Sequence, residues 1–131
     1  MREAMTPYVV HCTPATPLRA VARLMTEHRV HAVYVYDYGF EDDETVEPWG
    51  LVTDLALAAA ALGRLDGRIA REIVTRPLIT VYSDESLHHA AQLMVGNRVS
   101  HLAVLDPATQ RPAGVLSTLD IARVVAGQHR R

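Results

Sequence analysis

Ser117 and Asp120 stand where an apolar, strand-like segment runs into a helical one, in the sequence GVLSTLDIA (residues 114–122). If Ser117 ends the strand, Asp120 lies one helical turn later, and their oxygens sit beside the free backbone N–H groups of the helix start. Such a place can hold an anion or a hydroxyl-rich molecule, and a carboxylate there can bind a ribose diol. The same spacing is typical of a capping box, in which serine caps the helix and the acid reaches back.

A second junction, GLVTDLALA (residues 50–58), has the same shape but lacks the carboxylate. Thr53 replaces the serine and can still cap a helix or contact a ligand. Ala56 replaces the aspartate and cannot hold a ribose. Asp54 is a poor substitute, because two residues on a helix correspond to about 200° of rotation. We therefore expect one intact site and one weakened or empty site.

The two junctions close two copies of one unit. A shift of 69 places sets residues 9–37 over residues 78–106, with many identical pairs, and a longer loop then offsets the first copy by five residues. Each copy is expected to form a strand, a helix, two strands and a final helix. Thr16, before Pro17, is expected to cap the first helix. The predicted fold class is α+β, with tandem β-α-β-β-α repeats over residues 1–66 and 67–131 packed as a pseudo-twofold pair.

Composition excludes several classes of protein. The chain has 131 residues, 49% of them hydrophobic, and a net charge of −2, which gives no electrostatic case for binding nucleic acid or an anionic membrane. The longest apolar run, residues 55–62, is far shorter than the about 18 residues of a membrane span. A single cysteine excludes an internal disulfide and fits a reducing, cytoplasmic setting. We expect a cytoplasmic protein without nucleic-acid or membrane partners.

The duplicated unit, closed by Gly-h-h-[Ser/Thr]-x-x-Asp (h, hydrophobic), resembles the CBS domain, and the tandem resembles a Bateman module. The residues that carry this resemblance are MTP at 5–7, LM at 24–25 and 93–94, the RVH and RVSH segments, and GVLSTLD at 114–120. The resemblance implies a stand-alone regulatory module and not an enzyme. It implies an adenine nucleotide (AMP, ADP or ATP) as regulatory ligand, no required cofactor, and a separate effector protein that receives the signal. A homodimer is expected from the small apolar faces of the final helices.

The resemblance also suggests how the residues share one ligand. Asp120, with Ser117, is expected to bind the ribose hydroxyls, while Arg29 and His31 from the other copy face the phosphates. The remaining ligand-binding candidates are Ile79 and Thr80 at the adenine, and Thr53 and His101 at the weakened site.

An alternative uses no ligand. Ser117 and Asp120 would then act only as a helix cap, in a module for oligomerisation or protein interaction. The alanine-rich final helices would suit helix–helix contact between copies or between chains. No catalytic residues are predicted, and no metal site is expected, because the adjacent His88 and His89 lack the i,i+4 spacing of helical metal ligands.

Overall fold

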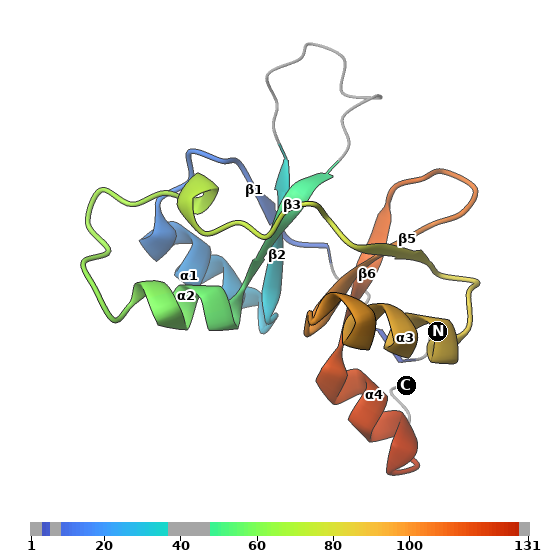
Figure 1. Ribbon diagram of the computed structural model, residues 1–131. Coiled ribbons are helices and arrows are strands. Elements are labelled where there is room, and N and C mark those ends of the chain that lie inside the picture. Colours follow the sequence, from blue (N-terminus) through green and yellow to red (C-terminus); the bar gives the residue numbers. More distant parts are fainter. Residues whose placement is uncertain (1–3, 6–8, 37–47, 129–131) are drawn as a thin grey trace. The chain divides into compact units, whose positions relative to one another are not determined.

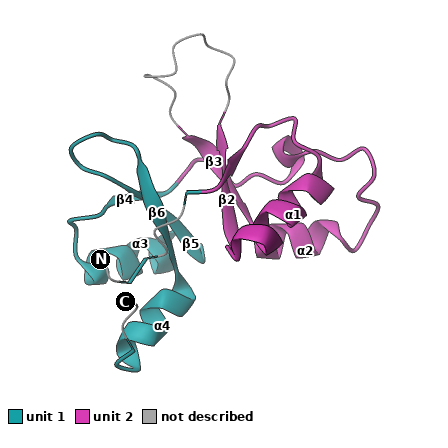
Figure 2. Cartoon of the chain, turned by 180° about the vertical axis from the view of Figure 1, so that it is seen from behind, with its two compact units in different colours: residues 1–9, 79–131 teal, residues 10–78 magenta. Residues whose placement is uncertain are grey.

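The computed structural model describes residues 4–5, 9–36 and 48–128 (Figure 1). The chain divides into two compact units that do not follow chain order (Figure 2). Unit 1 combines residues 1–9 with residues 79–131, and unit 2 consists of residues 10–78. Each unit contains a three-stranded sheet and helices, which confirms the α+β class and the repeated β-α-β-β-α order. The boundary between the two sequence repeats, predicted between residues 66 and 67, stays a prediction. The compact units are a different division of the chain, because they group residues by contact and not by sequence similarity.

Unit 2 holds the elements of the first repeat. β2 is the central strand of its sheet, parallel to β1 and antiparallel to β3. The first four residues of β2 are buried, as expected for a central strand with an uninterrupted apolar run. The elements are β1 (His11–Cys12), α1 (Leu18–His28), β2 (Ala32–Tyr36), β3 (Pro48–Thr53), α2 (Asp54–Ala60) and the short 3-10 helix η1 (Ala70–Glu72).

Unit 1 repeats this plan. β5 is the central strand, parallel to β4 and antiparallel to β6, and α4 follows β6 without a loop. The register pairs His101 at the start of β5 with Ser117 at the end of β6. The elements are β4 (Thr80–Tyr82), α3 (Leu87–Asn97), β5 (His101–Leu105), β6 (Pro112–Ser117) and α4 (Thr118–Val125).

The first helix of each repeat presents one face to its own core. In α1 the buried residues Leu18, Val21 and Met25 recur at spacings of three and four, which places them on one face of the helix. Both helices then end at an arginine in the left-handed conformation, with φ of 54° at Arg29 and 55° at Arg98. Glycine normally takes this position because it has no Cβ to clash.

Each core is completed by the segment that opens the other repeat. Val74, near the start of the second repeat, packs against the core of unit 2, where Leu51 and Thr75 exchange backbone hydrogen bonds of 2.7 and 3.4 Å. Met5 is the matching residue 69 places earlier, and it is buried in the core of unit 1. This exchange explains why residues 1–9 belong to the same unit as the second repeat.

The start of α1 differs from the prediction. Pro17 occupies the N-cap position of α1, and no side chain caps the helix. The hydroxyl of Thr16 instead accepts a hydrogen bond of 3.0 Å from the backbone N–H of Thr13, within a turn closed by the Thr16 N–H and the Thr13 carbonyl. The expected Thr16 cap was therefore wrong, because the turn uses that hydroxyl. Of the motif at residues 5–7 and the first expected strand, Thr6, Pro7 and Tyr8 lie outside the described residues.

Candidate functional site

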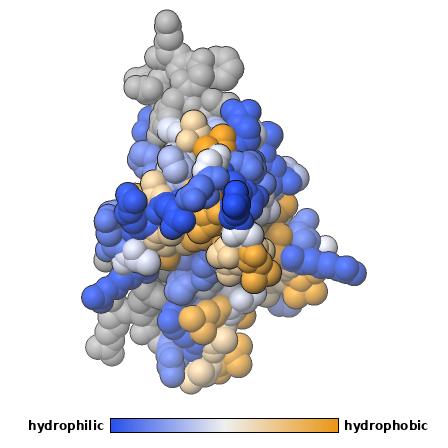
Figure 3. Space-filling view, turned by 90° about the vertical axis from the view of Figure 1, so that its left-hand side faces the viewer, coloured by the Kyte–Doolittle hydropathy of each residue, from blue (hydrophilic) through white to orange (hydrophobic). Residues whose placement is uncertain are grey.

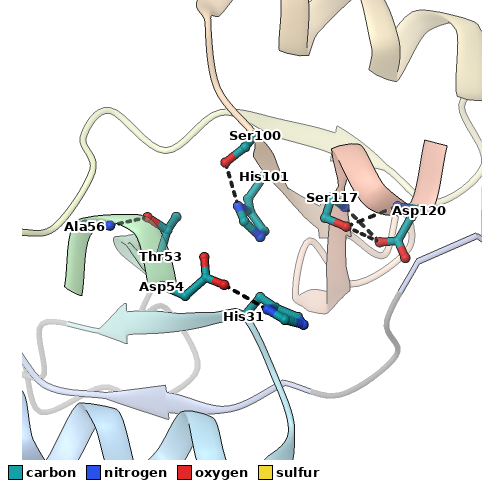
Figure 4. A network of polar contacts seen from close by, with 8 residues as sticks. All are labelled: His31, Thr53, Asp54, Ala56, Ser100, His101, Ser117 and Asp120. Atoms are coloured by element: carbon teal, nitrogen blue, oxygen red, sulfur yellow. Dashed lines mark hydrogen bonds and ion pairs between the residues drawn. The ribbon is translucent and has the colours of Figure 1, made fainter. Parts of the chain in front are cut away.

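Ser117 and Asp120 form a closed capping box at the start of α4 (Figure 4). The hydroxyl of Ser117 accepts a hydrogen bond of 3.2 Å from the backbone N–H of Asp120. The carboxylate reaches back, and its Oδ2 accepts bonds of 2.8 Å from the Ser117 N–H and 3.0 Å from the Ser117 hydroxyl. The cap forms because β6 ends at Ser117 in extended backbone and α4 begins at the next residue. Both elements of the sequence pattern are present: a helix cap, and a carboxylate held at a helix N-terminus.

The carboxylate of Asp120 also has a charged partner. The side chain of Asp120 is 2% exposed, and Nη1 of Arg123 donates to its Oδ1 at 3.2 Å. Because burial of an unpaired carboxylate is strongly unfavourable, hydrogen bonds and an opposite charge are the expected surroundings. The sequence reasoning missed Arg123, although acid and arginine three residues apart on a helix are a recognised pairing signal.

The matching junction of the first repeat keeps the cap and loses the charges. The hydroxyl of Thr53 accepts a 3.2 Å bond from the backbone N–H of Ala56 (Figure 4). Alanines occupy both positions that correspond to Asp120 and Arg123, residues 56 and 59. Thr53 is therefore a capping residue, as the sequence allowed.

His31 already has an anionic neighbour. Its Nδ1 lies 2.8 Å from Oδ2 of Asp54, the first residue of α2, and both side chains are largely exposed (Figure 4). Asp54 thus engages the turn before β2 instead of replacing the missing aspartate. The histidine ring predicted to face a phosphate shares its surroundings with a carboxylate, which weakens its attraction for another anion.

Arg29 and His31 line a pocket within unit 2. The pocket has a volume of about 540 Å³, which lies in the range of small-molecule sites. It is bordered by α1, by the turn that precedes β2 and by the first turns of α2. The other lining residues are mainly apolar: Ala22, Met25, Thr26, Val30, Asp54 and Leu57.

The remaining predicted residues lie in unit 1. His101 pairs with Ser117 across the β5–β6 ladder, and its Nδ1 lies 2.9 Å from the hydroxyl of Ser100. Ile79 packs partly buried against the core, and its carbonyl accepts a 3.0 Å bond from the Ala103 N–H. Thr80 opens β4 and is exposed. The structure therefore gathers His101, Ser117 and Asp120 at one end of the unit 1 sheet.

Comparison with known proteins decides the family. The sequence matches the CBS domain over residues 1–63 and again over residues 70–127. The chain belongs to the CBS domain family. The two matches confirm that its repeats are CBS domains, as the GVLSTLD motif and the duplication indicated.

Relatives of this CBS domain pair differ in length. An uncharacterized protein of Methanopyrus kandleri is 29% identical over 119 residues, which cover 88% of this chain and 57% of the relative. A second relative, an uncharacterized protein of Methanocaldococcus jannaschii, is 26% identical, and the chain spans 36% of its length. The CBS domain-containing protein YhcV of Bacillus subtilis is 27% identical over 124 residues, which cover 93% of this chain and 82% of that protein.

A solved structure shares the fold of the CBS domain pair. It is the CBS domain pair of protein MJ0100, in complex with 5′-methylthioadenosine and S-adenosyl-L-methionine. The TM-score is 0.77 at 22% identity, and the match covers 95% of this chain and 93% of that chain. At this identity the similarity establishes the fold.

We also searched the described residues of the CBS pair for a metal site, a membrane-spanning helix and a reactive cysteine. In that part of the chain no group of three His, Cys, Asp or Glu side chains could hold a metal ion, and no helix is long and apolar enough to cross a bilayer. Cys12 is buried, and burial raises the pKa of its thiol, partly offset by a hydrogen bond with Thr16. A protonated, buried thiol is a poor nucleophile.

Proposed function

We propose that this CBS domain pair is a binding module for an adenosine-containing ligand and not an enzyme. The observation that carries the proposal is the buried carboxylate of Asp120, held at the N-terminus of α4 by Ser117. A carboxylate fixed in this way can accept hydrogen bonds from the 2′- and 3′-hydroxyls of a ribose. The complex of the MJ0100 pair with two adenosine derivatives supports this ligand class. Within the class we propose AMP, ADP or ATP.

Other predicted residues offer groups that suit the remaining parts of such a ligand. Ile79 offers an apolar side chain and Thr80 an exposed strand edge in the same unit, which suits a flat adenine ring. Arg29 ends α1 and lines the pocket of unit 2, where its guanidinium can bind a phosphate. The prediction that Arg29 and His31 serve the same ligand molecule as Asp120 stays a prediction.

Titration calorimetry with AMP, ATP and adenosine tests the proposal. Asp120→Asn keeps the shape of the side chain and removes its charge, and we expect affinity to fall at least tenfold, since a charged hydrogen bond contributes about 1.5–3 kcal/mol. Asp84→Asn, an exposed carboxylate of the same unit, is the matched control and should bind as the wild type does. Ala56→Ser should also leave affinity unchanged. If no adenosine ligand binds at millimolar concentration, the binding function is wrong.

Ligands with and without phosphate test the role of Arg29. If Arg29 faces the phosphates of the molecule whose ribose Asp120 binds, Arg29→Ala should weaken ATP binding. Adenosine, which lacks phosphate, should be insensitive to Arg29→Ala. Equal losses for ATP and adenosine would show that Arg29 does not face the phosphates.

We further propose that ligand occupancy is passed to a separate effector protein through α4. Asp120 lies in the first turn of α4, so a ligand bound there stabilises the helix that carries exposed Leu119 and Val125. Such a signal requires the two states of the helix to differ in ligand affinity. Hydrogen exchange should therefore slow in residues 118–125 when AMP is added, and an unchanged rate would remove α4 from the signal path.

A second function, oligomerisation, is favoured by exposed apolar side chains. The final helices of both repeats carry such residues: Leu55 is 72% exposed, Leu119 51% and Val125 83%. Hydrophobic patches are visible among the polar surface in Figure 3. We propose that these helices form a homodimer. Light scattering should show a dimer that Leu55→Gln with Leu119→Gln converts to a monomer, and a monomeric wild type would exclude it.

A further inference from the structure

The Asp120 carboxylate that a ribose would bind is already paired with Arg123. Oδ2 of Asp120 is bonded to the backbone and the side chain of Ser117, within the capping box. Oδ1 accepts the 3.2 Å bond from Arg123. A diol that approaches Asp120 must therefore share or take the position of a guanidinium.

Asp120 and Arg123 occur together, because the second repeat has both residues and the first repeat has neither. The first repeat has alanine at residue 56 in place of Asp120 and alanine at residue 59 in place of Arg123, while it keeps the cap through Thr53. The cap alone therefore does not require the arginine. Arginine is present where the buried carboxylate is present, which indicates that its role is directed at that carboxylate.

We propose that Arg123 is a resident competitor for the Asp120 carboxylate, which a ligand displaces when it binds. The inference rests on the proposed ribose site. The side chain of Arg123 is 38% exposed, so its guanidinium can move into water, whereas Asp120 is 2% exposed and is fixed by Ser117. Displacement thus moves the arginine and leaves the carboxylate in place.

Competition of this kind depends on the ribose hydroxyls. A ligand whose hydroxyls bind the Asp120 carboxylate must move the guanidinium that donates to the same group. A 2′,3′-dideoxy analogue has no hydroxyl to place there and can leave the ion pair intact. The resident arginine therefore lowers the affinity of ligands with a diol and leaves the affinity of the dideoxy analogue unchanged.

Calorimetry with AMP and 2′,3′-dideoxy-AMP on wild type and Arg123→Ala tests the inference. The variant installs the residue that the first repeat has at this position. We expect AMP to bind about fivefold more tightly, because one partly exposed ion pair no longer competes for the carboxylate. The preference for AMP over 2′,3′-dideoxy-AMP should widen by the same factor, because only AMP had to displace the guanidinium. A merely structural arginine would not change this ratio.

Two controls complete the experiment. Arg111→Ala removes an exposed arginine at the end of the β5–β6 ladder opposite Ser117, and it should change neither affinity nor selectivity. Arg123→Met keeps an unbranched side chain without charge, and it replaces Arg123→Ala if the latter melts below the assay temperature. Weaker or unchanged AMP binding by the Arg123 variant, while Asp120→Asn abolishes binding, overturns the competitor role alone. If the wild type binds neither nucleotide, both proposals fall.

Discussion

The two repeats share the same strand-to-helix junction but carry different side chains at it. In both, a strand ends at a hydroxyl residue that caps the following helix, Ser117 in unit 1 and Thr53 in unit 2. Unit 1 adds a buried carboxylate and its arginine, whereas unit 2 has two alanines and an exposed pair of His31 and Asp54. The comparison separates a part that the fold needs from a part that it does not. The hydroxyl cap is common to both repeats, and the buried carboxylate with its arginine is particular to one of them.

A second comparison concerns how the units are completed. Met5 and Val74 occupy equivalent positions near the start of the two repeats, and each packs into the core of the unit that the other repeat builds. Both units are thus completed in the same way, although their junctions carry different side chains. In unit 2 the completing segment packs tightly on β3 at Gly50, where an added Cβ would lie 2.6 Å from the carbonyl oxygen of Thr75.

Gly50→Ala is expected to have the largest effect on stability. The new methyl group would collide with the Thr75 backbone, and overpacking at such a contact destabilises by about 3 kcal/mol. Urea denaturation measures the change. Gly63→Ala is the control, because a Cβ there meets its nearest atom at 3.9 Å, and its stability should change by less than about 0.5 kcal/mol. Equal values for the two variants would contradict the close packing of residues 74–76 on β3.

Met5→Ala tests the exchange of segments. Met5 is 7% exposed in the core of unit 1, and truncation of a buried methionine destabilises by about 2 kcal/mol. Hydrogen exchange should accelerate in β5, which lies in the same core, and stay unchanged in β2 of unit 2. Met25→Ala, with the same exposure in unit 2, should give the reverse pattern. Faster exchange in β2 from Met5→Ala would show that residues 1–9 complete the other unit.

Much of this fold could be predicted from the sequence because the patterns that indicate each strand and helix are local and occur twice. Both repeats contain the predicted order of strand, helix, two strands and final helix, and in both the last strand ends at the hydroxyl residue of the junction motif, Thr53 or Ser117. Duplication supplied two independent readings of each element. The Thr16 cap failed because a neighbouring turn competes for the same hydroxyl, and a single-residue propensity does not include that competition.

The site was only partly predictable. Ser117 and Asp120 lie three residues apart, so their contact follows from helical geometry, and the capping box that we weighed against ligand binding is present. The pairing of His31 with Asp54 joins residues 23 apart in sequence, and no local pattern reports it. The exchange of Met5 and Val74 depends on tertiary packing, which the local sequence pattern does not report.

The two caps should differ in their contribution to stability. Thr53→Ala removes one hydrogen bond from the start of α2, and loss of such a cap costs about 1 kcal/mol. Ser117→Ala removes the equivalent bond and also a donor to the buried Asp120 carboxylate, so the loss should be about 2 kcal/mol. Thermal denaturation of both variants measures the difference. If Ser117→Ala is no worse than Thr53→Ala, the hydroxyl contributes nothing to holding the carboxylate.

The pair of His31 and Asp54 is expected to have the smallest effect. Both side chains are largely exposed, 68% and 48%, so solvent screens their attraction and the coupling should be about 0.5 kcal/mol or less. A double-mutant cycle with His31→Ala and Asp54→Ala measures it in low salt, and 1 M NaCl should abolish the charged part. Ser100 and Thr118, the equivalent uncharged residues of unit 1, supply the control cycle and should show no salt dependence. A coupling above about 1.5 kcal/mol would mean that the pair is shielded from water, and the turn before β2 would then be as well ordered as the buried junction of unit 1.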